Sequence, residues 1–291
     1  MIRHVQFSRL KLAIIISTII IAASGSLSAQ TPQTAKEFFD RGNQVFDKGD
    51  YDAAIADYSE AIKLLPVAWG AFNGRGNAYF RKGNNAAALA DYTEAIRLKP
   101  DFVLALYNRS LIHLNENRYD AALSDCKEAY RLKPDHADAH IVCGMAMHSK
   151  QELDAAILEY QTAIKLDPKN ANAVANLGDA YRDKNDHNAA ITNYTKAISL
   201  APELTLAYTR RAGEHQQLGN LLAAIADYTT SLKLAPDDPD VLYYRALVYV
   251  DLKQKKEAIA DLKQALKIKP DHAEAKAELA KLATPPQKKR P

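Results

Sequence analysis

The chain has 291 residues, of which 47% are hydrophobic and 25% are charged, as is typical of a folded protein rather than a disordered one. Its formal charge is +3, from 38 basic and 35 acidic residues. Arg3, Arg9 and Lys11 are the only Lys or Arg among the first 29 residues, which contain no acidic residue, so the rest of the chain carries 35 charges of each sign. This balance argues against nucleic acid as a partner, because nucleic-acid binding requires a strongly basic face.

Residues 1–29 have the three parts of a secretory signal peptide. The basic residues precede an uncharged, mainly apolar run from Leu12 to Ala23, which is followed by the small-residue segment from Ser24 to Ala29. Because this run is shorter than the roughly 20 residues that span a bilayer, we expect cleavage after Ala29 and a periplasmic or secreted protein. The alternative is an uncleaved segment that anchors the chain in the inner membrane, which is the only case in which we expect membrane contact.

A 34-residue period follows a linker at residues 30–34. Seven prolines mark it: Pro66, Pro100, Pro134, Pro168, Pro202, Pro236 and Pro270. With proline at position 32, the units are 35–68, 69–102, 103–136, 137–170, 171–204, 205–238 and 239–272. Apolar residues recur at three- and four-residue spacing in each half-unit, and glycine or a polar turn residue lies near position 15. Each unit is therefore predicted to be a helix–turn–helix hairpin that ends at its proline.

Small residues are predicted to lie where the two helices of a hairpin cross. Position 20 is alanine in all seven units, position 8 is glycine, serine or alanine, and position 24 is tyrosine in five units. A single hairpin cannot bury its apolar face, so the units are expected to stack. We therefore predict an all-α solenoid of seven repeats, a capping helix at residues 273–283 and a disordered basic tail at 284–291.

Residues such as Arg75-Gly76-Asn77-Ala78-Tyr79 and Lys99-Pro100-Asp101 resemble the tetratricopeptide repeat family, and the resemblance covers residues 35–272. It implies a right-handed superhelix whose concave groove is lined by the first helix of each pair. It also implies that the groove binds an extended segment or a helix of one or more partner proteins. The alternative for each groove residue is packing between helices. The candidate binding residues are Phe39, Asn43, Phe46, Asn73, Asn77, Phe80, Tyr107, Asn108, Leu111, Tyr243, Tyr244 and Leu247.

Catalysis is not expected, because the leader and the repeats leave no room for a catalytic domain. We therefore expect no catalytic residues, no cofactor and no metal. His136, His140, Cys143 and His148 have a spacing compatible with zinc, but His136 falls in an inter-unit loop and His140 at a packing position. The preferred function is an adaptor or scaffold in the cell envelope. The alternatives are a membrane-tethered assembly factor and a ligand-binding accessory subunit of an enzyme. Partner, pathway and oligomeric state stay open.

Two side-chain pairings follow from the period. In five units position 7 is arginine and position 23 is aspartate, and both lie equally far from the turn, which predicts an ion pair within each hairpin. The only cysteines, Cys126 and Cys143, lie level on either side of Pro134. An exported protein meets oxidising conditions, so a disulfide is one alternative and two unpaired core thiols are the other.

Overall fold

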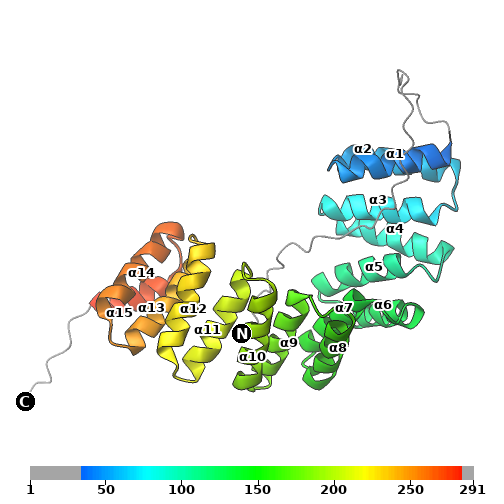
Figure 1. Ribbon diagram of the computed structural model, residues 1–291. Helices are drawn as coiled ribbons and strands as arrows, with labels where there is room; N and C mark the ends of the chain where they lie inside the picture. The colour runs from blue at the N-terminus through cyan, green and yellow to red at the C-terminus, as the bar shows by residue number, and fades with distance from the viewer. Residues whose placement is uncertain (1–33, 284–291) are drawn as a thin grey trace, which may run out of the picture.

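The computed structural model describes residues 34–283, and within this range the chain forms fifteen helices and no strand (Figure 1). The predicted all-α solenoid is confirmed. The helices are α1 (Ala35–Asp47), α2 (Tyr51–Leu64), α3 (Trp69–Arg81), α4 (Asn85–Leu98), α5 (Val103–Asn115), α6 (Tyr119–Leu132), α7 (Ala137–Ser149), α8 (Leu153–Leu166), α9 (Ala171–Asp183), α10 (His187–Leu200), α11 (Thr205–Gln217), α12 (Leu221–Leu234), α13 (Pro239–Asp251), α14 (Lys255–Ile268) and α15 (Ala273–Ala283).

The helices form hairpins that are stacked along a curved path (Figure 1). Each odd-numbered helix from α1 to α13 begins at the first residue of a 34-residue unit and packs against the even-numbered helix that follows it. Each even-numbered helix also packs against the next hairpin, and α15 packs against α14. Each unit therefore contacts mainly its neighbours, as in other solenoids, and some successive first helices, such as α5 and α7, also contact each other.

The turn inside each hairpin is made by a residue in the left-handed region. The residues at position 15 have positive φ in all seven units: Gly49 (84°), Gly83 (78°), Asn117 (59°), Gln151 (64°), Asn185 (62°), Gly219 (76°) and Lys253 (60°). Glycine and asparagine tolerate this conformation best, so five of the seven turns use a favourable residue. Side chains then cap several second helices, as where Asp50 Oδ1 accepts a hydrogen bond from the Ala53 N–H at 3.1 Å.

The helices of a hairpin cross at small residues, as predicted. The position-20 alanines are fully buried in every unit: Ala54, Ala88, Ala122, Ala156, Ala190, Ala224 and Ala258. At position 8, Gly178 lies directly under the ring of Tyr194, and a Cβ added to this glycine would lie 2.6 Å from Tyr194 Cε1. The ring fills the space that the missing side chain leaves, which lets the two backbones approach closely.

None of the described helices is long and apolar enough to cross a membrane. The predicted signal peptide, its predicted cleavage site after Ala29 and the predicted basic tail lie outside the described residues. The last helix, α15, buries Ala275 and places Leu279 and Leu282 against the apolar cluster of units six and seven. This packing covers the apolar surface that the last hairpin would otherwise expose.

Candidate functional site

The predicted arginine–aspartate pairs are confirmed in all five units. Arg75 donates from Nε and Nη2 to the two carboxylate oxygens of Asp91, both at 2.8 Å. The other pairs have the same two-bond geometry: Arg41–Asp57, Arg109–Asp125, Arg211–Asp227 and Arg245–Asp261. Because the planar guanidinium matches the carboxylate, each pair fixes the two helices of its hairpin at the same level.

The arginines also link consecutive units, which the sequence reasoning missed. Arg75 Nη1 donates to Ser59 Oγ of the preceding unit at 3.0 Å. Position 25 of the preceding unit supplies a hydroxyl in the other three cases too: Arg109 with Thr93, Arg211 with Thr195 and Arg245 with Thr229. The signal was present in the sequence, because position 25 is serine or threonine wherever the next unit has arginine at position 7.

The seam between units three and four is joined differently. Position 7 of unit four is Cys143, which forms a disulfide with Cys126 of α6, with the Cα atoms 5.7 Å apart. Nearby, His140 stacks on Tyr130, with the planes inclined by 3°, and its Nδ1 lies 2.6 Å from a carboxylate oxygen of Glu159. The disulfide thus takes the place of the arginine–hydroxyl bond at this seam, and the His140–Glu159 contact joins the two helices of hairpin four, which has no arginine–aspartate pair.

The histidines considered for zinc have separate partners in the structure. His136 caps α7 through Nδ1, which accepts from the Ala139 N–H at 3.2 Å. His148 Nε2 lies 2.7 Å from Asp183 Oδ2 on the next first helix, and Cys143 is bonded to Cys126. Within residues 34–283, no three histidine, cysteine or carboxylate side chains converge in a way that could hold a metal ion.

Several predicted groove residues lie on the first helices and are held in place by buried tyrosines. Tyr58 Oη donates to Asn43 Oδ1, and Tyr92 Oη donates to Asn77 Oδ1, both at 2.7 Å. Asn77 Oδ1 also accepts from Asn108 Nδ2 at 3.0 Å. Within the described residues, the Nδ2 groups of Asn43 and Asn77 donate no hydrogen bond. The amides are therefore oriented by the core while keeping a free donor.

Three of the predicted groove residues are buried and need correction. Tyr107 is 4% exposed and belongs to the core cluster around the disulfide, and Phe46 is 8% exposed with its ring centroid 5.4 Å from that of Tyr51. Asn73 is 9% exposed and accepts a hydrogen bond from Asn108. At these positions the helix turns the side chain toward the neighbouring helix, so these residues stabilise packing and are not available to a partner.

The remaining candidates are partly accessible. They are Phe39, Asn43, Asn77, Phe80, Asn108, Leu111, Tyr243, Tyr244 and Leu247. Leu104, at position 2 of unit three, is 53% exposed and extends this surface. We call the accessible side chains at positions 2, 5, 6, 9 and 12 of the first helices the first-helix face.

The middle of the first-helix face is charged. Asp179 accepts from Tyr194 Oη at 2.7 Å and from Arg182 at 3.1 Å, and it forms an ion pair with Arg210 of the next unit. Partial burial disfavours the charged form of Asp183, but hydrogen bonds from His148 and Arg182 outweigh it and lower the pKa of Asp183 to about 2. These linked charges tie units four to six together.

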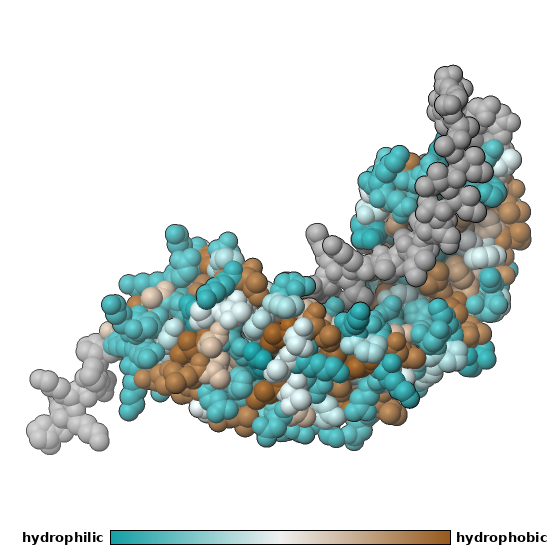
Figure 2. Space-filling view, viewed as in Figure 1, coloured by the Kyte–Doolittle hydropathy of each residue, from teal (hydrophilic) through white to brown (hydrophobic). Residues whose placement is uncertain are grey.

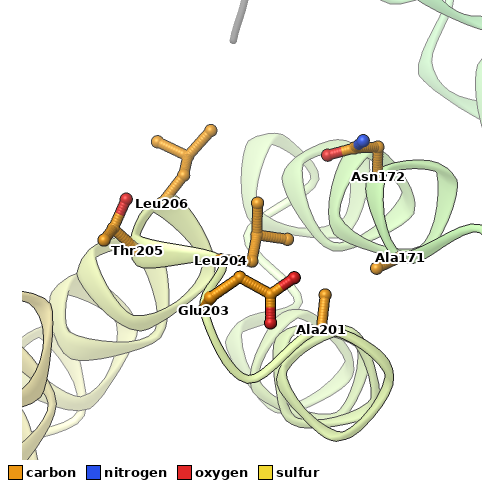
Figure 3. Close-up of a pocket in the computed structure, with 7 residues that line it drawn as sticks. All are labelled: Ala171, Asn172, Ala201, Glu203, Leu204, Thr205 and Leu206. Atoms are coloured by element: carbon orange, nitrogen blue, oxygen red, sulfur yellow. The ribbon is translucent and has the colours of Figure 1, made fainter. Parts of the chain in front are cut away.

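A shallow hollow lies beside the loop between units five and six. Figure 3 shows it between the N-terminal end of α9 and the loop before α11, with Asn172, Glu203, Leu204 and Leu206 among its lining residues. Leu206 is 38% exposed. Hydrophobic and hydrophilic residues alternate over the face seen in Figure 2, so this view shows no single continuous apolar band. The accessible residues of the first-helix face include both amides and apolar side chains, so this face offers mixed polar and apolar contacts.

Solved structures similar to this chain share its fold. The APC/C hetero-tetramer Cut9–Hcn1 matches with a TM-score of 0.67 and 18% identity, over 86% of this chain and 53% of that chain, so the match spans about half of that relative. A tetratricopeptide repeat protein from Parabacteroides merdae ATCC 43184 matches with a TM-score of 0.67 and 19% identity, over 86% and 99%. YrrB matches with a TM-score of 0.53 and 20% identity, over 64% and 96%. No curated protein matches the chain.

Family models match most of the repeat region. All of them describe the tetratricopeptide repeat, and they match residues 39–101, 74–137, 144–181, 171–204, 206–238 and 239–272. These matches agree with the helical hairpins, the buried position-20 alanines and the proline period. The chain belongs to the tetratricopeptide repeat family.

Proposed function

We propose that this chain is a non-catalytic adaptor of the cell envelope that binds an extended segment of a partner protein along its first-helix face. One observation carries the proposal. Asn43 and Asn77 are fixed by buried tyrosine hydroxyls, while their Nδ2 donors have no partner among the described residues. Oriented donors of this kind suit the main-chain carbonyl groups of an extended segment, because little side-chain entropy is lost when they bind.

The apolar neighbours support the same proposal. Leu104 is 53% exposed beside Asn108, and Leu111 is half-buried one turn further along α5. Amides alternating with apolar side chains can bind both the main chain and the side chains of a partner. A similar structure, that of YrrB, is described as a tetratricopeptide repeat protein with an unusual peptide-binding site, which is a statement about YrrB and supports this proposal only through the shared fold.

The test compares two variants that each shorten two surface side chains, one pair on a first helix and the other on second helices. The first-helix variant is Leu104→Ala with Asn108→Ala. The control is Leu158→Ala with Leu222→Ala on the second helices, where the two leucines are 63% and 74% exposed. Tagged chains are captured from crosslinked cells, and the bound proteins are identified by mass spectrometry. We expect the wild type and the control to retain a partner that the first-helix variant loses. Equal capture by both variants would contradict binding on this face.

The envelope location rests on the leader and has its own test. We expect N-terminal sequencing of the protein from cells to start at Gln30, which would show that the leader has been cleaved off. A start at Met1, with the protein in the membrane fraction, would instead favour the membrane-tethered assembly factor.

A further inference from the structure

Position 9 of the first helix decides whether the buried tyrosine of the same hairpin has a hydrogen-bond acceptor. In units one, two and five, an asparagine or aspartate at position 9 accepts the tyrosine hydroxyl at 2.7 Å. In unit six, position 9 is Gly213 and the tyrosine at position 24 is Tyr228. A glycine offers no acceptor side chain, so unit six lacks the group present in these three units, as does unit four, where position 9 is Met145 opposite Tyr160.

Gly213 leaves an open space on the first-helix face. A Cβ added to Gly213 would meet only Tyr228 Oη, at 3.9 Å, whereas a Cβ added to Gly178 would meet the ring of Tyr194 at 2.6 Å. Tyr228 is 3% exposed, and its Oη has no hydrogen-bond partner among the described residues. Tyr228 Oη is not among the fully enclosed unpartnered polar atoms of the described residues, so the hydroxyl can donate to a group that enters this space. We call this space, with Tyr228 Oη at its base, the Gly213 notch.

The surroundings of the notch indicate what it would accept. Burial and the nearby carboxylate of Glu214 raise the pKa of Tyr228, so its hydroxyl keeps its proton and acts as a donor. The ring of Tyr244 stacks on Tyr228 with centroids 6.3 Å apart, and Arg210, one turn earlier on α11, is already paired with Asp179. The notch therefore combines a donor that has no partner among the described residues with an aromatic neighbour.

We infer that the Gly213 notch receives a neutral carboxamide side chain, asparagine or glutamine, from the partner segment that binds the first-helix face. This assignment rests on the proposed function. The carboxamide oxygen would accept the Tyr228 hydroxyl, as Asn43 and Asn77 accept theirs within their own units. A carboxylate is disfavoured because Glu214 already places a negative charge near this hydroxyl.

Two substitutions at Gly213 distinguish the effect of an acceptor side chain in the notch from the effect of losing the backbone freedom of glycine. Gly213→Asn supplies the acceptor found in units one and two and closes the notch. Gly213→Ala removes the same backbone freedom, but its single methyl group leaves Tyr228 Oη without an acceptor. The full chain is used to select binders from a random peptide library displayed on phage. Affinities of the enriched synthetic peptides are then measured by calorimetry for the wild type and both variants.

We expect the enriched peptides to share an asparagine or glutamine whose replacement by alanine weakens binding. We expect Gly213→Asn to weaken binding about tenfold or more, and Gly213→Ala to change it by no more than about threefold, with neither variant melting below the wild type. Unchanged affinity for Gly213→Asn, equal loss in both variants, or a lower melting temperature for both would overturn the notch assignment and leave the proposed function intact. If no peptide binds the wild-type chain, both proposals fail together.

Discussion

The Arg75–Asp91 pair provides a quantitative test of how each hairpin is held together. The side chains of Arg75 and Asp91 are 21% and 7% exposed and share two hydrogen bonds of 2.8 Å. Removing one member of a buried pair costs about 3–5 kcal/mol because the other charge stays buried without its partner. Since Arg75 retains some solvent contact and a bond to Ser59, we expect about 3 kcal/mol for either single alanine substitution.

The double substitution should cost much less than the sum of the single ones. We expect about 4 kcal/mol for Arg75→Ala with Asp91→Ala, which gives a coupling energy of about 2 kcal/mol. Solenoids do not always unfold in one step, so hydrogen exchange of amides in α3 and α4 should accompany urea unfolding followed by circular dichroism. A coupling energy below about 0.5 kcal/mol would show that the pair does not hold the hairpin together.

The first unit offers a matched control for this experiment. Arg41 and Asp57 form the same two-bond pair, but the Arg41 side chain is 44% exposed and has no described unit before it to supply a hydroxyl. Solvent screening reduces the value of exposed pairs to about 1 kcal/mol or less. The same cycle at this pair should therefore give a clearly smaller coupling energy than at Arg75 and Asp91. Equal coupling at the two sites would contradict the role assigned to burial.

Three further predictions concern the disulfide, acid stability and the helix crossings. Intact mass after alkylation, with and without reductant, should show one disulfide between Cys126 and Cys143. Reduction should destabilise the chain by about 3 kcal/mol because the bond closes a short loop. Alkylation of either cysteine without reductant would contradict the disulfide. The pKa of Asp183 is lowered to about 2 from 3.8, so Asp183 contributes up to about 2 kcal/mol to the free energy of unfolding above pH 4, and this contribution is lost as the pH falls toward 2. The urea midpoint should therefore depend less on pH in Asp183→Asn than in the wild type. An unchanged dependence on pH would refute the assignment. Gly178→Ala should lower the melting temperature through about 1–3 kcal/mol of overpacking against Tyr194, whereas a rise would show that the ring can move aside.

The sequence alone determined the repeat, the hairpins and the arginine–aspartate pairs. Each depends on distance along the chain from a turn: prolines end the units, position-15 residues make the turns, and Arg75 and Asp91 are level because both lie eight residues from position 15. Distance from a turn gives the height of a residue along its helix, since the helical rise per residue is constant. These features therefore require no knowledge of how the hairpins stack.

Only the tertiary structure decided which side chains reach the first-helix face. Height along a helix does not say how a side chain is turned relative to the next hairpin, so Phe46, Asn73 and Tyr107 resemble their accessible neighbours in sequence but are buried. The angle at which hairpins stack depends on contacts between residues far apart in the chain. The same contacts leave Tyr228 without an acceptor above Gly213, because a hydroxyl acquires or lacks a partner only once the helices around it are packed.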